Sequence, residues 1–130
     1  MNIAVITGAS SGMGREFVYA IDKDVELDEM WVIARREDRL LELQDKVRAK
    51  IRPVVLDLLD RNSLSQFKAM LELEKPNVKV LVNAAGFGLF GTYTEMDMEK
   101  QLEIIDLNDR ALTGMTYITL PYMAEGSQIY

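Results

Sequence analysis

The sequence predicts an α/β protein in which a doubly wound parallel sheet carries helices on both faces. Short apolar runs, which predict strands, alternate four times with segments of helical periodicity. A glycine-rich turn follows the first run, and a turn of small residues follows the fourth. We therefore expect one domain over residues 1–130, with four full strands and the beginning of a fifth.

The amino-acid composition excludes or disfavours several classes of function. The 130 residues carry a net charge of −6, from 15 basic and 21 acidic side chains, which disfavours general binding to nucleic acid. There is no Cys and no His, so disulfides, thiol or imidazole catalysis and zinc–thiolate sites are excluded, and no metal site is expected. The first residues lack a secretory signal and no apolar run approaches membrane-spanning length, so we expect a cytoplasmic protein with no membrane partner.

The first half of the chain should contain three strands and two helices. The second helix is marked by Leu40, Leu43 and Val47, whose i, i+3 and i+7 spacing is that of an amphipathic helix. The third strand contains Pro53, which cannot donate to a β-ladder and therefore favours an edge of the sheet. The expected strands are residues 2–7, 30–34 and 51–56, and the expected helices are residues 13–22 and 37–50.

The second half continues the alternation. A helix at 62–75 is stopped by Pro76 and precedes a fourth strand at 78–82. Residues 86–94, with three glycines and three aromatic residues, should form a loop. Thr94 and Asp97 resemble a capping box before a long helix at 98–119, and residues 127–130 look like the start of another strand.

The stretch Thr7-Gly8-Ala9-Ser10-Ser11-Gly12-Met13-Gly14 joins the first strand to the first helix. Its glycines allow a sharp turn and close approach to a bound group, and the N-terminus of the following helix suits a phosphate. At the first strand-to-helix turn, this pattern predicts a Rossmann-type, dinucleotide-binding fold. The alternative is a turn that needs glycine only for its backbone angles. The predicted cofactor-binding residues here are Gly8, Ser10, Ser11, Gly12, Met13 and Gly14.

Two further strand ends predict the adenosine side of such a site. Arg35 and Arg36 follow the second strand, where an acidic residue would bond the 2′-hydroxyl of NAD and an arginine accommodates the 2′-phosphate of NADP. We therefore expect NADP in preference to NAD; the alternative is a pair of solvated arginines. Asp57, followed by Leu58, comes after the third strand and can accept a hydrogen bond from the adenine amino group, or serve as a loop or cap carboxylate.

Two asparagines mark the remaining candidate positions. Asn83-Ala84-Ala85-Gly86 ends the fourth strand in small residues that leave room for a ligand, and the Asn83 side chain can hold that turn by bonding to neighbouring backbone. A plain strand-ending turn is the alternative. Asn108 lies on an apolar stripe of the long helix and should be buried, where it can open the helix ladder and bind a water, or satisfy a local carbonyl.

Together, the glycine turn, Asp57, Asn83-Ala84-Ala85-Gly86 and Asn108, in this order and spacing, resemble the short-chain dehydrogenase/reductase family over the whole chain. The resemblance implies a Rossmann fold, a nicotinamide dinucleotide as cofactor and hydride transfer between a carbonyl and an alcohol. It also implies that Asn108 is a catalytic residue that supports a proton-relay water.

The chain departs from the family pattern at its end. The family's catalytic Ser and Tyr-x-x-x-Lys would follow Tyr130, which itself has no Lys four residues on. We therefore expect the NADP-binding portion of an oxidoreductase, inactive in this form, whether a truncated product, an isolated piece or a degenerate relative. The alternatives are a stand-alone nucleotide-binding or regulatory module and a folding fragment that binds nothing tightly.

Self-association is also expected. In the family's strand order the fourth strand lies beside the fifth. A fifth strand of a few residues would leave residues 78–82 as an unpaired apolar edge, unless residues 128–130 fold back to close it. The long helix would also lose part of its cover, and in family members this helix commonly packs against a neighbouring subunit. Both features predict a homo-oligomer.

Overall fold

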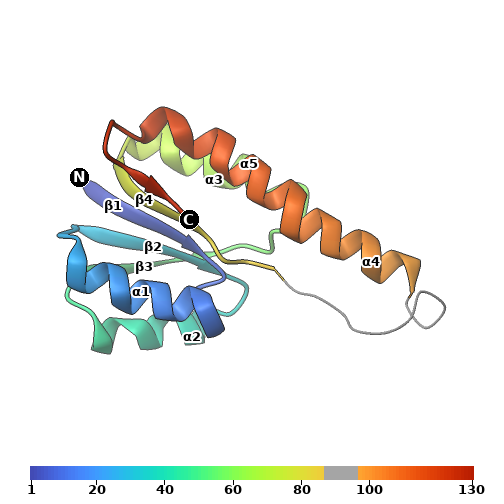
Figure 1. Cartoon of the computed structure of the whole chain (residues 1–130), viewed down its shortest axis with the longest axis horizontal. Helices are drawn as coiled ribbons and strands as arrows, with labels where there is room; N and C mark the ends of the chain where they lie inside the picture. Colours follow the sequence, from blue (N-terminus) through green and yellow to red (C-terminus); the bar gives the residue numbers. More distant parts are fainter. Residues whose placement is uncertain (87–96) are drawn as a thin grey trace.

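The computed structural model has a five-stranded parallel sheet at its centre, in the order β3-β2-β1-β4-β5 (Figure 1). The structure describes residues 1–86 and 97–130. The strands are β1 (Asn2–Thr7), β2 (Glu29–Ala34), β3 (Lys50–Val55), β4 (Asn77–Asn83) and β5 (Gln128–Ile129). The expected α/β fold, with four full strands and a short fifth, is confirmed.

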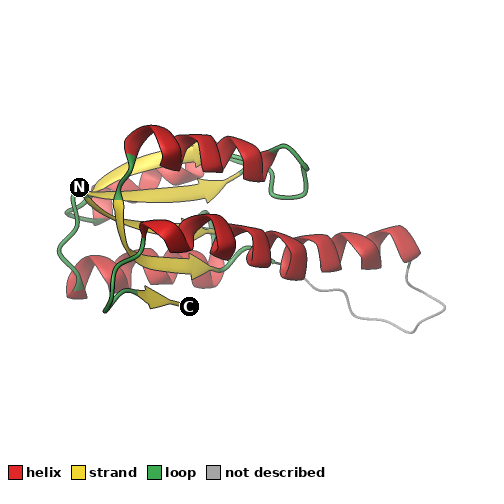
Figure 2. Cartoon of the chain, turned by 90° about the horizontal axis from the view of Figure 1, so that it is seen from above, coloured by secondary structure: helices red, strands yellow, loops and turns green. Residues whose placement is uncertain are grey.

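Helices cover both faces of the sheet (Figure 1, Figure 2). α1 (Gly12–Asp24) and α2 (Glu37–Leu41) lie on one face, and α3 (Ser63–Glu74) and α5 (Leu112–Thr119) lie on the other. α4 (Met98–Ile105) continues the line of α5 past the end of the sheet. None of the helices in residues 1–86 and 97–130 combines the length and apolar character that crossing a bilayer requires.

Each face of the sheet has its own hydrophobic core, because side chains alternate along every strand. In β1, Ile6 packs with α1 and α2, whereas its neighbour Val5 packs with α3 and α5. On the second face, Trp31 of β2 meets Phe67 of α3 edge-on, with ring centroids 6.2 Å apart. The two cores fix the strands relative to the helices and so fix the strand ends around the candidate site.

β3 forms one edge of the sheet, as Pro53 predicts. Pro53 lies opposite Val32 of β2 in the parallel register. Because Pro53 has no N–H, it cannot extend the ladder to another strand, and the exposed Lys50 adds a charge at the same edge. This edge is therefore protected from further pairing.

The helix expected at 37–50 is shorter than predicted. α2 ends at Leu41, and a 3-10 turn, η1 (Glu42–Lys46), leads towards β3. The Gln44 side-chain amide donates to the Ala49 carbonyl at 3.1 Å and accepts from the Ile51 N–H at 2.7 Å. The periodic apolar residues still face the core, but these side-chain bonds replace the helical ladder and end the helix early.

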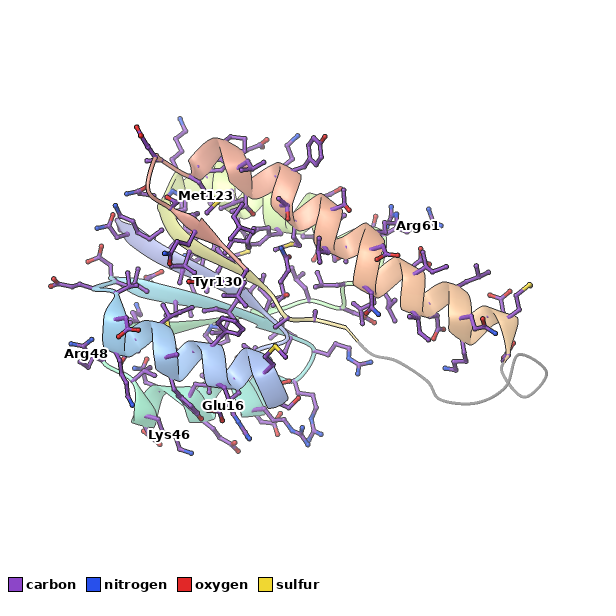
Figure 3. All side chains as sticks on the ribbon, in the orientation of Figure 1. Glu16, Lys46, Arg48, Arg61, Met123 and Tyr130 are labelled. Carbon is purple, nitrogen blue, oxygen red and sulfur yellow. The ribbon has the colours of Figure 1, made fainter. Side chains whose placement is uncertain are left out.

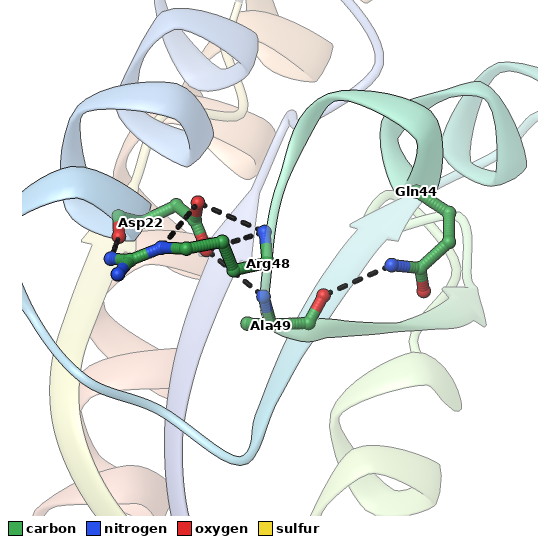
Figure 4. Close-up of polar contacts among 4 residues, drawn as sticks. All are labelled: Asp22, Gln44, Arg48 and Ala49. Atoms are coloured by element: carbon green, nitrogen blue, oxygen red, sulfur yellow. Dashed lines mark hydrogen bonds and ion pairs between the residues drawn. The ribbon is translucent and has the colours of Figure 1, made fainter.

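Asp22 links the end of α1 to the start of β3 through hydrogen bonds (Figure 4). Its carboxylate accepts hydrogen bonds from the N–H groups of Arg48, at 3.0 and 3.1 Å, and of Ala49, at 3.0 Å. Burial on its own raises the pKa of Asp22. The hydrogen bonds from Ala49 and Arg48 and the charge of Arg48 outweigh burial and lower the pKa below its usual value. Asp22 therefore stabilises the fold in its charged form.

The long helix expected at 98–119 is present but is not uniform. Between α4 and α5 lies a π-helical segment, η2 (Asp106–Ala111), which contains Asn108, and a 3-10 turn, η3 (Leu120–Tyr122), follows α5. Asp97, expected as the far member of a capping box, is itself the N-cap: it accepts from the Glu99 N–H at 3.0 Å. Thr94 and the loop expected after Gly86 lie outside the described residues.

β4 is not the open edge that the sequence predicts. β5 pairs with it in parallel, and Ile129 lies opposite Leu81. The Tyr130 N–H donates to the Leu81 carbonyl and the Asn83 N–H donates to the Tyr130 carbonyl, both at 2.9 Å. The Tyr130 side chain is labelled beside α1 in Figure 3. Its ring meets that of Phe17 in α1, with centroids 5.3 Å apart. The fold-back alternative is therefore the one observed, because these bonds between distant segments close the β4 edge over residues 80–83.

We expect Asp22→Asn to lower the free energy of unfolding at pH 7 by about 2 kcal/mol, because a hydrogen bond to a charged group contributes roughly 1.5–3 kcal/mol. The pKa of Asp22 is lower in the folded chain than in the unfolded chain. The contribution is therefore present above the unfolded pKa, near pH 4, and is lost as the pH falls through the folded pKa.

Urea unfolding at pH 7 and at pH 3 measures both effects. Asp24→Asn is the matched control, because Asp24 is exposed and two residues away on the same helix. Equal losses in the two variants at pH 7 would contradict the stabilising role of Asp22.

Candidate functional site

One cavity of about 490 Å³ lies at the carboxyl ends of the strands, beside the N-terminus of α1. In an open α/β sheet this is the edge at which ligands bind. The lining residues are Gly8, Ser10, Ser11, Gly12, Met13, Ile33, Ala34, Arg35, Leu56, Asp57, Leu58, Leu59, Ala84, Ala85, Gly86 and Leu107. Eleven of the residues predicted for the site line this cavity, whereas Gly14, Arg36, Asn83 and Asn108 do not.

Close packing explains two of the glycines in the turn after β1. Gly8 has a φ of +64°, and a Cβ there would lie 2.7 Å from the Ala84 carbonyl oxygen. Only glycine therefore lets this turn pass so close to the end of β4. Gly14 is buried in the first turn of α1, where a Cβ would strike the Gly8 carbonyl. Gly14 thus sets the packing of the helix on the turn and does not line the cavity.

Gly12 differs, because the space beside it is empty. Its φ is +55°, and apart from its chain neighbours and the adjoining backbone of α1, no atom of the described residues lies within 4 Å of the position of its Cβ. Ser11, the N-cap of α1, makes no capping bond with its side chain, and the first turn of this helix contains no acidic residue. The first N–H groups of α1 carry the positive end of the helix dipole without a capping side chain. This arrangement suits an anion.

Thr7 is a residue of the site that sequence reasoning missed. Its buried hydroxyl accepts hydrogen bonds from the N–H groups of Ala84 and Ala85, at 3.0 and 3.1 Å, and donates to the Val82 carbonyl at 3.3 Å. One side chain therefore binds the turn after β4 to the end of β1. The available signal was a hydroxyl at the last position of a buried strand, since such a group must find hydrogen-bond partners.

Arg35 and Arg36, predicted together, separate at the end of β2. Arg35 is exposed and lines the cavity. Arg36 is the N-cap residue of α2, and its guanidinium lies 3.5 Å from the Asp38 carboxylate, outside the cavity lining. The turn after β1 is held against this strand end, because the Gly8 N–H donates to the Ile33 carbonyl at 2.9 Å. The geometry thus favours Arg35 as the arginine that a cavity-bound group would meet.

Asp57 and Leu58 line the cavity after β3. The Asp57 carboxylate accepts a hydrogen bond from the Leu59 N–H at 3.0 Å, which fixes a tight turn. Leu58 is buried in the core beneath α3 and α5. Only one carboxylate oxygen takes part in the turn, so the loop role and a ligand role for Asp57 are compatible.

The two asparagines act through contacts that the sequence did not predict. The Asn83 amide donates to the Thr116 hydroxyl of α5 at 3.1 Å, instead of bonding to its own turn. Asn108 is half-buried, not buried as predicted, because η2 lies near the open end of the sheet. Its carboxamide oxygen would lie 2.6 Å from a Cβ on Gly86. Gly86 therefore permits the close approach of η2 to the end of β4.

Sequence reasoning also missed five lining residues, all of them apolar. They occupy the last positions of strands or flank predicted site residues. Their place in the sequence could therefore have identified them as lining residues, whereas an apolar side chain gives no such signal. They are Ile33, Ala34, Leu56, Leu59 and Leu107.

The chain contains one Tyr-x-x-x-Lys spacing, at Tyr19 and Lys23 in α1. Tyr19 packs against the core beneath α1 and α2, and the Lys46 amine lies 5.8 Å from its ring centroid. Neither Tyr19 nor Lys23 lines the cavity. In the part of the chain that the structure describes, no tyrosine and no lysine lines it.

A family model described as short chain dehydrogenase matches residues 2–128. The chain belongs to the short-chain dehydrogenase family. A short-chain dehydrogenase of Pseudocercospora fijiensis is 32% identical over 127 residues, which cover 94% of this chain and 40% of that protein. An NADP-dependent 3-hydroxy acid dehydrogenase of Escherichia coli is 31% identical over 128 residues, which cover 95% of this chain and 49% of that protein.

A solved structure of a family member agrees with this assignment. The short-chain dehydrogenase from Sphingobium yanoikuyae in complex with NADPH matches with a TM-score of 0.80 and 26% identity, over 93% of this chain and 48% of that one. The resemblance drawn from the motifs is therefore confirmed. This short-chain dehydrogenase chain spans about half the length of the relatives it matches.

Gly12→Asn should weaken NADPH binding by at least about tenfold while the chain stays folded. Asn tolerates a left-handed backbone, and its side chain would fill the open space beside Gly12. Gly126→Asn is the matched control, because Gly126 has a φ of +90°, no atom near its Cβ position and no place in the cavity lining. Circular dichroism and calorimetric titration compare the two variants. Full affinity in Gly12→Asn would show that Gly12 serves the turn alone.

Proposed function

We propose that this chain binds NADP(H) as one cytoplasmic dinucleotide-binding domain and is the cofactor-binding portion of an oxidoreductase that interconverts carbonyls and alcohols. The observation that carries the proposal is the single cavity shared by the uncapped N-terminus of α1, the open space at Gly12 and Arg35. NADP(H) has a pyrophosphate and a 2′-phosphate for these two positive positions. The NADP-dependent relative and the NADPH complex support the same cofactor.

The residues present fit this cofactor. Gly12 and Met13 would receive the pyrophosphate at the helix N-terminus, Arg35 the 2′-phosphate, and Asp57 with Leu58 the adenine. The small side chains after β4 leave room for the remainder of the molecule. Bound NADPH supplies the hydride of the reaction, and the part of this chain is to bind and orient it.

We also propose that Asn108 supports the proton-relay water that the family resemblance implies. Its position supports this role, because its side chain approaches Gly86 at the end of β4 and its neighbour Leu107 lines the cavity. A π segment also leaves backbone groups outside the regular helical ladder, and such segments are frequent at functional sites.

Arg35→Ala should weaken NADPH binding by about 10- to 100-fold, since a charge-assisted contact contributes roughly 1.5–3 kcal/mol. NADH binding should barely change, because NADH has no 2′-phosphate. Arg36→Ala is the matched control: it removes the same charge one residue away, from a side chain paired with Asp38 outside the cavity. Calorimetric titration with both cofactors measures the effect. Equal losses for NADPH and NADH in Arg35→Ala would overturn the assignment.

The purified chain should bind NADPH without oxidising it in the presence of ketones or aldehydes. No tyrosine or lysine of the described residues lines the cavity, and the sequence has no His or Cys to donate a proton in their place. The absorbance of NADPH, followed against a heat-denatured control, measures turnover. Consumption above that control would contradict the prediction and direct attention to Tyr130, Tyr117 and Tyr122.

We further propose that the chain forms a homodimer through α4. Met98, Leu102 and Ile105 are 66%, 46% and 52% exposed, and their i, i+4 and i+7 spacing places them on one helix face. α4 buries none of its residues and extends past the end of the sheet (Figure 1). A second copy of the same helix would cover this apolar face.

Light scattering coupled to gel filtration at micromolar concentration should show twice the mass of one chain. Leu102→Lys should shift the protein to a monomer, because a charge on the apolar face opposes its burial. Leu73→Lys is the matched control, since Leu73 of α3 is 84% exposed and lies on a different helix. A monomer formed by the unchanged chain would refute the proposal.

A further inference from the structure

We propose that Met13 is a site of reversible thioether oxidation, and that its oxidation lowers the affinity of the cavity for its dinucleotide. The inference rests on the proposed function and adds a chemical control to the same site. Two features carry it: which oxidisable side chains the protein has, and where the structure places them.

Methionine sulfur is the principal target for mild oxidants in this chain. The sequence has eight Met, no Cys and one Trp. Trp31 is fully buried between the sheet and α3. A two-electron oxidant of the peroxide class therefore meets thioethers and no competing thiol.

Exposure and position separate Met13 from the other methionines that the structure describes. Met13 is 72% exposed, compared with 66% for Met98 and 49% for Met1. Of the described methionines, Met13 alone lines the cavity. The buried or half-buried ones are Met30, Met70, Met115 and Met123. Access to oxidant and contact with the cavity thus coincide at one residue.

The polarity of the Met13 side chain affects anion binding because of where this side chain lies. Met13 lies in the first turn of α1, directly after Gly12, and the space where a Gly12 side chain would lie is open. The N–H groups of this turn have no capping side chain and carry the positive end of the helix dipole. An apolar thioether leaves that charge free to receive an anion.

Oxidation would change this environment in one step. A hydrogen peroxide molecule transfers one oxygen atom to the Met13 sulfur: the S–O bond forms, the O–O bond breaks, the sulfur is oxidised by two electrons and the peroxide is reduced to water. The sulfoxide oxygen carries partial negative charge beside the helix N-terminus. There it repels a pyrophosphate and offers the helix N–H groups an acceptor of their own. A methionine sulfoxide reductase with a dithiol restores the thioether.

The effect is reciprocal. If the sulfoxide weakens dinucleotide binding, the bound dinucleotide must disfavour the sulfoxide by the same factor. A bound dinucleotide also covers Met13, so only the free fraction of the chain reacts. At a concentration ten times the Kd, about one chain in eleven is free, and oxidation should slow by about tenfold.

The first experiment measures oxidation with and without the dinucleotide. Calorimetric titration of the untreated chain with NADP+ gives the Kd; no binding at this stage would overturn the proposed function and the inference with it. A hydrogen peroxide time course, read by peptide mass spectrometry, then compares Met13 with Met1, an exposed internal control outside the cavity and outside α4. NADP+ should slow oxidation about tenfold at Met13 and not at Met1. Equal rates at Met13 with bound NADP+ would overturn the inference and leave the proposed function standing.

The second experiment assigns the change in affinity to one sulfur. Peroxide treatment should weaken NADP+ binding several-fold in the unchanged chain, and reductase treatment should restore it. The affinity of Met13→Leu for NADP+ is measured before and after peroxide treatment, and the two values should be equal. A loss of affinity in treated Met13→Leu would assign the effect to another residue and overturn the inference.

Discussion

The junction between the ends of β1 and β4 governs the arrangement of the candidate site. A Cβ on Gly8 would lie 2.7 Å from the Ala84 carbonyl oxygen, so the two turns can meet only with glycine at this position. The Thr7 hydroxyl bonds to the N–H groups of Ala84 and Ala85 across the same junction. Because β1 is the middle strand of the sheet, these contacts set the distance between the N-terminus of α1 and the small residues after β4. The other walls of the cavity are built around that fixed distance.

The strands were predictable from the sequence because their signals are local. Apolar runs and their bounding turns located both ends of all five strands to within one residue, and Pro53 alone placed β3 at an edge. The end of α2 was not predictable in this way. Gln44 and Asp22 form side-chain bonds to backbone that comes close only in the folded chain, and these bonds outweigh the helical periodicity of residues 37–50. The closure of the β4 edge by Tyr130 is likewise a contact between distant segments.

The candidate site was likewise predictable where its signals are local and not where it depends on tertiary contacts. The glycine turn and the small residues after β4 stand out because their residue types are unusual at strand ends, and both line the cavity. Arg35 and Arg36 are equivalent in sequence, and only the path of the backbone at the start of α2 separates them. The partner of Asn83 is Thr116, on a helix whose position depends on the packed core. Residue type therefore predicted which segments form the site, and tertiary packing decided which side chains face it.

The two edges of the sheet differ in their capacity to accept another strand. At β3, Pro53 lacks the N–H that a ladder needs. At β5, the backbone of Tyr130 bonds to β4, so by alternation the N–H and carbonyl of Ile129 point away from the sheet. A head-to-tail array would have to join β5 of one copy to β3 of the next, and Pro53 opposes that contact. Two copies that met at β5 would form a closed, two-fold pair. Growth into a fibre by this route is therefore opposed at its second step.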